Sequence, residues 1–180
     1  MLSAMTDEQG ALATPRLRLV AATKAMVDAD LEGEHQLAEM LDVALPHDWP
    51  PQHHDVDTLR FIRAALSRHG AGGWWLYYIV LTDTVPPTLV GTAGYKGPPS
   101  DGVVEIGYSV VPSWQRHGFA TEASAALIEA AQRRGADVVV AQTLPHLRPS
   151  IAVLRRLGFA PAEPPEPGVL AFALRLDPHH

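Results

Sequence analysis

The spacing of apolar residues changes several times along the chain, and each change predicts a different kind of element. Polar and apolar residues alternate over residues 16–20, which is typical of a strand with one buried face. Longer apolar, β-branched and aromatic runs, separated by turns rich in proline and glycine, predict a three-stranded antiparallel meander and two later strands. These strands are expected over residues 74–81, 88–95, 103–110, 138–141 and 169–176.

Apolar residues recur at helical spacing in the stretches between these strands. Helices are predicted over residues 24–45 (with a break at Gly33), 56–68, 121–134 and 150–157. The order strand, helix, strand around the third of these helices predicts a parallel crossover, and therefore a mixed sheet. The pattern as a whole predicts an α/β (α+β) fold with about seven strands and about four flanking helices.

Length, charge and the lack of cysteine limit the possible functions. A chain of 180 residues is long enough for one core, so we expect one domain at residues 15–177, a flexible segment at residues 1–14 and a tail at residues 178–180. The formal net charge of −6 argues against nucleic-acid or membrane partners and is compatible with a cationic substrate. Without cysteine there is no disulfide, Cys-ligated zinc or thiol nucleophile. No leader-like or membrane-spanning apolar run is present, so we expect a cytoplasmic protein.

The segment that joins the strand at residues 103–110 to the next helix is the most informative in the chain. It reads Gln-Arg-His-Gly-Phe-Ala-Thr over residues 115–121. The start of a helix leaves about four backbone N–H groups without partners inside the helix, and it attracts anions. Arg116 adds a cation, and Gly118 and Ala120 leave the approach open. The turn is therefore a candidate phosphate site, with an ordinary tight turn as the alternative; other phosphate-binding motifs are absent.

Residues 115–120 resemble the Q/R-x-x-G-x-G/A signature of the GNAT N-acetyltransferases. A second stretch, residues 150–159 (SIAVLRRLGF), is similar to the S-x-x-V-L-x-K-L-G-F helix of the same family. The Glu-Ile-Gly-Tyr strand before the turn and the Thr-Glu-Ala helix start after it most resemble the branch of ribosomal-protein N-terminal acetyltransferases and their small-molecule relatives. The resemblance covers about residues 16–176.

This resemblance implies acetyl-CoA as acyl donor and a sheet that splays apart between the family's fourth and fifth strands, where the pantetheine arm lies. Backbone groups of Val110 and Val111 are then expected to bind the arm, and the amides that follow to hold the pyrophosphate. The cofactor-binding residues expected on this basis are Val110, Val111, Gln115, Arg116, His117, Gly118, Phe119, Ala120, Thr121 and Arg155. Leu147 departs from the family, which usually has asparagine at this position to contact the arm.

Three residues are candidates for proton transfer. An attacking amine has to lose a proton at neutral pH, and Glu105, whose side chain is expected to point opposite to Val104 and Ile106, is the candidate base. The alternative for Glu105 is a solvated strand residue. Ser150 resembles the family position that protonates the departing thiolate; a helix N-cap is the alternative or additional role. Tyr108 is a weaker acid candidate, because its predicted direction is that of core residues.

The acceptor is expected to be a primary amine on a small molecule or a peptide N-terminus. Trp49, His53 and His54 are candidates for the wall of its site, against the alternative of a plain surface loop. The histidines lack the spacing of metal ligands, so no metal is expected. The chain is expected to be a monomer or a homodimer.

An acyl-CoA-binding regulatory module with the same fold is the alternative function, and Leu147 is the observation that favours it. An interaction scaffold without cofactor is the third class of function.

Overall fold

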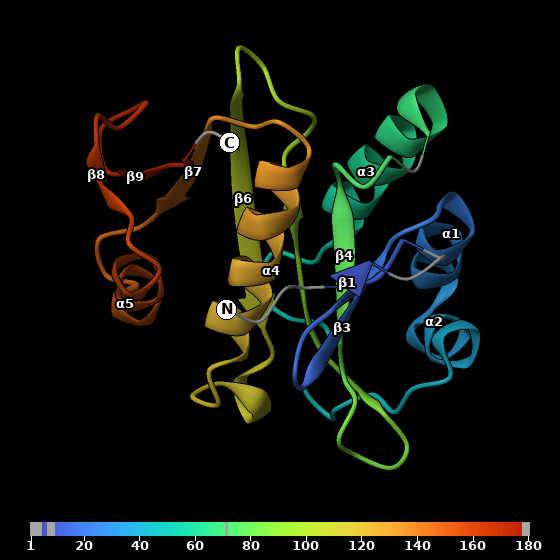
Figure 1. The fold of residues 1–180 in the computed structure, drawn as a ribbon. Helices are drawn as coiled ribbons and strands as arrows, with labels where there is room; N and C mark the ends of the chain where they lie inside the picture. The colour runs from blue at the N-terminus through green and yellow to red at the C-terminus, as the bar shows by residue number, and fades with distance from the viewer. Residues whose placement is uncertain (1–4, 7–9, 71, 178–180) are drawn as a thin grey trace.

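The computed structural model describes residues 5–6, 10–70 and 72–177 (Figure 1). This part of the chain contains nine strands, five α-helices and one 3-10 helix. In chain order the elements are β1 (Met5–Thr6), β2 (Leu12–Ala13), β3 (Leu17–Ala21), α1 (Lys24–Glu32), α2 (Glu34–Leu41), α3 (Val56–His69), β4 (Leu76–Leu81), β5 (Thr88–Tyr95), β6 (Val103–Val110), η1 (Pro112–Trp114), α4 (Phe119–Arg133), β7 (Val138–Thr143), α5 (Arg148–Arg156), β8 (Ala160–Ala162) and β9 (Leu170–Arg175).

All nine strands belong to one sheet, in the order β1-β2-β3-β4-β5-β6-β7-β9-β8. Neighbouring strands are antiparallel except β6 and β7, which are parallel and are connected through α4. The predicted mixed sheet is therefore confirmed, together with the helical crossover that makes it mixed.

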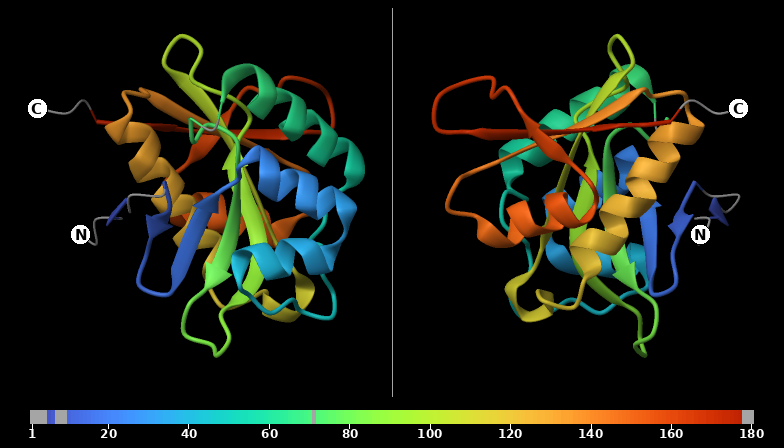
Figure 2. Two further views of the ribbon diagram at one scale, coloured as in Figure 1. Left: turned by 90° about the vertical axis from the view of Figure 1, so that its right-hand side faces the viewer. Right: turned by 60° about the vertical axis from the view of Figure 1, so that its left-hand side comes forward.

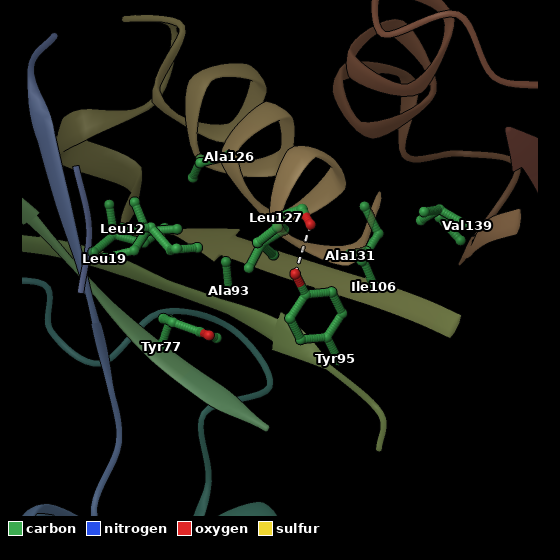
Figure 3. Close-up of a cluster of buried hydrophobic side chains, with 14 of the residues drawn as sticks. Leu12, Leu19, Tyr77, Ala93, Tyr95, Ile106, Ala126, Leu127, Ala131 and Val139 are labelled. Carbon is green, nitrogen blue, oxygen red and sulfur yellow. Dashed lines mark hydrogen bonds between the residues drawn. The ribbon is translucent and has the colours of Figure 1, made fainter. Parts of the chain in front are cut away.

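Helices cover both faces of this sheet (Figure 2). The apolar faces of α1, α2 and α3 pack with β4 and β5 in one core cluster, and α4 packs with β3 to β7 in the other. Four buried alanines on α4 bring this helix close to the sheet: Ala123, Ala126, Ala130 and Ala131. At this interface the Tyr95 hydroxyl donates a hydrogen bond of 2.5 Å to the carbonyl of Leu127 (Figure 3).

The sheet opens between β6 and β7. These strands pair only from Val103 to Ile106 on β6, whereas β6 remains paired with β5 up to Val110. Two hydrogen bonds mark the ends of the β5–β6 pair: Val111 N–H donates to the Val90 carbonyl, and Lys96 N–H donates to the Glu105 carbonyl. They show that the odd-numbered residues of β6 turn their backbone groups toward β5. By the alternation of an antiparallel ladder, the backbone groups of Tyr108 and Val110 point the other way, into the opening. The splay implied by the family resemblance is confirmed.

The extra strands lie at the two edges of the sheet. Strands β1 and β2 fall in residues 1–14, which were expected to be flexible; Leu12 is fully buried and pairs with Leu19, because it completes the core under α4. Residues 1–4, 7–9 and the expected tail at 178–180 lie outside the described part of the chain. Strand β8 contains Pro161 and pairs only with β9. An edge strand tolerates proline, because its missing N–H is not needed by a second neighbouring strand. Within the described residues, no helix combines the length and apolar character needed to cross a membrane.

Candidate active site

The turn between β6 and α4 has the geometry of an anion site. Helix α4 begins at Phe119, two residues earlier than the sequence predicted, and Gly118 precedes it with φ +80°. Glu122 N–H donates to the Gly118 carbonyl, so the amides of Phe119, Ala120 and Thr121 have no acceptor inside the helix. Glycine suits the left-handed φ at position 118, and the absence of a Cβ leaves room for the Arg16 guanidinium, which a Cβ would approach to 3.4 Å.

A cavity of about 580 Å³ connects this turn to the opening between β6 and β7. Its wall is formed by four parts of the chain: the end of β6, the turn at residues 112–121, one side of α5 with the residue before it, and residues 52–53. The lining residues are Gln52, His53, Tyr108, Ser109, Val110, Pro112, Trp114, Gln115, Arg116, Gly118, Phe119, Ala120, Thr121, Leu147, Pro149, Ser150, Ala152, Val153 and Arg156.

One buried polar atom at this wall has no partner. The Oγ1 atom of Thr121 is inaccessible to water and forms no hydrogen bond among the described residues. An unsatisfied buried hydroxyl costs about 1–3 kcal/mol. Thr121 lines the cavity and belongs to the first turn of α4, beside the free amides. The amides and Arg116 together fit a pyrophosphate group.

Two of the residues expected to bind the cofactor are engaged elsewhere. Val111 donates its N–H to Val90, accepts from Trp114 N–H and has a fully buried side chain. His117 turns its ring toward its own turn, with Nδ1 3.1 Å and 2.9 Å from the carbonyls of Trp114 and Gln115, and stacks on Phe119. Neither residue lines the cavity.

The two arginines near the end of α5 point to different places. Arg155, one of the expected cofactor residues, lines a second pocket on another side of α5, whereas its neighbour Arg156 lines the cavity. The sequence already pointed to Arg156, because the lysine of the family's S-x-x-V-L-x-K-L-G-F helix aligns with this residue. Gln115, another of the expected cofactor residues, lines the cavity, and its Nε2 donates to the carbonyl of Val110 at 2.9 Å.

A charged clasp that no sequence pattern predicted holds the start of α4. The carboxylate of Glu122 accepts hydrogen bonds from Thr14 Oγ1 (2.6 Å), Arg16 N–H (2.9 Å) and Arg16 Nε (2.8 Å). Arg16 also donates to the carbonyl of His117 at 2.9 Å and lies 4.7 Å from the centre of the Phe119 ring. Burial by itself raises the pKa of Glu122, but the bonds from Thr14 and Arg16 outweigh it and the net pKa is lowered. Glu122 is part of the quoted Thr-Glu-Ala stretch, but nothing in the sequence pairs it with Arg16.

Tyr108 and Ser150 meet across the opening. The Tyr108 hydroxyl lies 3.2 Å from Ser150 Oγ and 3.2 Å from the Ser150 carbonyl, to which it donates. Burial raises the pKa of Tyr108, and its bond to Ser150 offsets this only in part. The alternative reading of Ser150 as a helix N-cap is wrong, because α5 begins at Arg148 and Leu147 is its N-cap. Both hydroxyls therefore face the cavity as a pair.

Glu105 lies on the other face of β6. Val104 and Ile106 are buried in the core under α4, and Glu105 points away from them, as the strand alternation predicts. Its side chain is 21% exposed, and Oε1 accepts a hydrogen bond of 2.6 Å from Lys96 Nζ. The carboxylate is thus half-buried and holds an ammonium group.

The segment at residues 46–55 divides into a surface part and a buried part. His53 has φ +66° and lines the cavity, but Trp49 and His54 are buried in the core under α1 to α3. His54 Nε2 lies 2.7 Å from Asp30 Oδ2, and the Tyr78 hydroxyl donates to the same oxygen at 2.8 Å. Burial, followed by the charge of Asp30, raises the pKa of Tyr78 far above its ordinary value. Trp49 and His54 therefore support the wall from beneath and do not form its surface.

One residue anchors this segment to the phosphate turn. Asp48 accepts hydrogen bonds from Ser113 N–H (2.7 Å) and Ser113 Oγ (2.6 Å), so both oxygens of its carboxylate hold η1. The Ser113 hydroxyl, more than any other group, lowers the pKa of Asp48. Nothing in the sequence indicated this contact. Among the described residues there is no group of three or more His, Asp and Glu side chains that could hold a metal ion.

A family model, a protein sequence and solved structures each match this chain. The family model described as the acetyltransferase (GNAT) domain matches residues 16–160. The chain is 29% identical over 150 residues to "Uncharacterized N-acetyltransferase YjdG" of Bacillus subtilis (strain 168), covering 82% of this chain and 88% of that protein.

Solved structures share the fold. The ribosomal L7/L12 α-N-protein acetyltransferase RimL, in complex with coenzyme A, has a TM-score of 0.66 at 23% identity and covers 91% of this chain and 96% of that chain. An acetyltransferase of Salmonella typhimurium that modifies the N-terminal serine of the 50S ribosomal protein L7/L12 has a TM-score of 0.60 at 21% identity, covering 91% and 97%.

Proposed function

Because this chain belongs to the GNAT acetyltransferase family, we propose that it transfers the acetyl group of acetyl-CoA to a primary amine by direct attack in a ternary complex. The observation that carries the proposal is the continuous cavity from the free amides at the start of α4 to the open edge of β6. An anion site alone fits many ligands. An anion site that continues into an unpaired strand edge fits a carrier with a diphosphate at one end and an amide-containing arm.

The geometry supports a specific set of proposed contacts to the donor. The amides of Phe119, Ala120 and Thr121, with Arg116 beside them, hold the diphosphate. The backbone groups of Tyr108 and the N–H of Val110, which face the opening, bind the amides of the arm as a neighbouring strand would. Arg156 adds a second cation at the wall. Acetyl-CoA supplies the acetyl group as a thioester, which an uncharged amine can attack.

Glu105 is the proposed proton acceptor for the amine. An α-amino group titrates near 8 and a lysine side chain near 10.4, so at neutral pH most of the acceptor carries a proton that has to be removed. The Glu105 carboxylate is half-buried and already binds the Lys96 ammonium at 2.6 Å, so an amine that is still protonated can bind there too. The base acts directly or through one water, and such a base contributes about 10²- to 10⁴-fold.

The pair of Tyr108 and Ser150 is the proposed proton donor to the sulfur that leaves. Because burial raises the pKa of Tyr108, its hydroxyl stays protonated at neutral pH and can supply a proton through, or beside, the Ser150 hydroxyl at 3.2 Å. The two proton transfers take place on opposite faces of β6, since Glu105 and Tyr108 point in opposite directions.

Purified protein tests the proposal in two steps. Acetyl-CoA at high excess should raise the melting temperature, because ligand that binds only the native state stabilises it. A panel of peptides and small amines, read by the release of free thiol, should then identify an acceptor, and Glu105→Gln should lower turnover about 10²-fold with acetyl-CoA binding unchanged. No thermal shift with acetyl-CoA would refute the proposal outright.

A second function, binding of an acyl-CoA without turnover, rests on two observations. Leu147 lines the cavity where the family has an asparagine, and Lys96 neutralises the proposed base. The same assay separates the two functions: a thermal shift without thiol release for any amine supports the binding module.

A further inference from the structure

Gly107, in the middle of β6, has a property that none of the other strand glycines shares. A Cβ built on it meets no heavy atom within 4 Å. On β5, a Cβ on Gly91 or Gly94 would lie 2.3 Å or 2.2 Å from a backbone oxygen, so close packing requires glycine at both of those positions. Gly107 also has no left-handed φ. Neither packing nor backbone conformation therefore requires glycine at position 107.

A strand glycine often marks a bulge, a tight bend or a place where a ligand or another backbone comes close, and the β5–β6 pairing shows no bulge at Gly107. Side chains alternate along β6, so the space over Gly107 lies on the face of Glu105 and Ser109, two residues away on either side. This face is accessible: Val103 is 38% exposed, and Val138 and Val140 on the neighbouring β7 are only partly buried.

The open space adjoins both the proposed base and the donor cavity. Ser109 lines the cavity together with Gln52 and His53, so the cavity reaches the Glu105 face of β6. Glu105 lies on the other side of Gly107 from Ser109, and its carboxylate forms an ion pair with the ammonium of Lys96. A molecule above Gly107 therefore lies between the end of the donor cavity and the base.

We infer that the space over Gly107 receives the group next to the attacking amine, and that Gly107 determines how large this group can be. The inference rests on the proposed acetyl transfer. The acceptor is then a primary amine whose neighbouring carbon carries a substituent, and a side chain at position 107 takes up the room that this substituent needs. Amines with an unsubstituted neighbouring carbon are affected least.

Two variants, Gly107→Ala and Gly107→Val, test the inference against peptides that differ only in their first residue: glycine, alanine, serine or leucine. The melting temperature should not fall, because each new side chain enters open space. The affinity for acetyl-CoA should stay within about twofold. The kcat/KM for the leucine peptide should fall at least tenfold more than that for the glycine peptide, with a smaller, graded loss in Gly107→Ala. Gly94→Ala is the comparison for stability and should melt at a lower temperature.

Several results would overturn the inference while leaving the proposed function in place. An equal loss for all four peptides, or no loss for any, would show that Gly107 does not select the acceptor. A large loss of acetyl-CoA affinity would assign the space to the donor, and a melting temperature as low as that of Gly94→Ala would show that the space is filled in solution. If the unmodified protein binds acetyl-CoA but acetylates no amine, the acetyl transfer itself fails and the inference with it.

Discussion

Replacing Glu122 with glutamine tests whether the clasp to Arg16 holds the start of α4. Glutamine keeps one acceptor oxygen for Thr14 and the Arg16 amide, but it loses the charge and faces the guanidinium with an NH₂ group. The wild-type carboxylate accepts Arg16 Nε at 2.8 Å and lies 2.7 Å from Arg16 Nη2. Two charge-assisted bonds contribute about 1.5–3 kcal/mol each when buried.

The position of Arg16 reduces this value. Its side chain is 40% exposed and that of Glu122 is 16% exposed, so water replaces part of what the variant loses. Taking about half of the contribution that the two bonds would make if fully buried gives a loss of roughly 2 kcal/mol in the free energy of unfolding. For a domain of this size, that corresponds to a fall of about 4–8 °C in the melting temperature.

The pH dependence of unfolding gives a second measurement. The folded-state pKa of Glu122 is lowered from its ordinary value of 4.5. A carboxyl with a lowered pKa stabilises the fold above its unfolded-state pKa, and this contribution disappears as the pH falls through the folded-state pKa. The difference between wild type and Glu122→Gln should therefore be full at pH 7 and shrink below about pH 4.5.

A matched control lies on the same helix. Glu129 forms an exposed i,i+4 pair with Arg133 at 3.8 Å, so Glu129→Gln should change the free energy of unfolding by about 0.5 kcal/mol or less. Urea titrations of the three proteins at several pH values measure these differences. If both variants unfold alike at pH 7, or if the Glu122→Gln deficit persists at acidic pH, the clasp does not act as described.

Three further outcomes are expected. Arg156→Ala should weaken acetyl-CoA binding about tenfold by calorimetry, while Arg155→Ala, one residue away and outside the cavity, should not. Ser150→Ala should lower kcat about 10²-fold with little change in KM. The double variant with Tyr108→Phe should have nearly the same kcat, because the effects of groups that act as a unit are not additive. If the losses of kcat in the two single variants multiply in the double variant, the two hydroxyls do not act as a pair. Asp48→Asn should loosen the wall that carries His53, because Asp48 anchors this segment to Ser113. The KM for the acceptor should therefore rise about tenfold more than the KM for acetyl-CoA, as measured by steady-state kinetics with each substrate varied in turn.

Local patterns in the sequence predicted the central elements well. Strand β6, the turn and α4 were predicted because each has a strong period or a glycine at the point where the chain changes direction. The same alternation correctly placed Glu105 opposite Val104 and Ile106. Strand β2 escaped prediction because only two residues pair, and Leu12 alone gives no period. Strand β8 escaped because Pro161 argued against a strand, although an edge strand tolerates it.

The site was predictable only as far as one segment of the chain contains it. The turn at residues 115–121 could be found because its residues are consecutive. The contacts of Glu122 with Arg16, Ser113 with Asp48, and Ser150 with Tyr108 span 106, 65 and 42 positions, and each partner is an ordinary residue in its own segment. Such pairs form because the topology brings two elements together, and no local spacing encodes them.

The register of β6 explains how one strand carries both halves of the proposed site. Along its open half, residues of even number turn their backbone groups into the splay and their side chains toward α4 and α5, as Tyr108 and Val110 do. Residues of odd number bond to β5 and place Glu105, Gly107 and Ser109 on the opposite face. A shift of one residue would exchange the two sets and point the carboxylate into the core. The β5–β6 pairing thus fixes the face of the sheet on which each of the proposed proton-transfer groups lies.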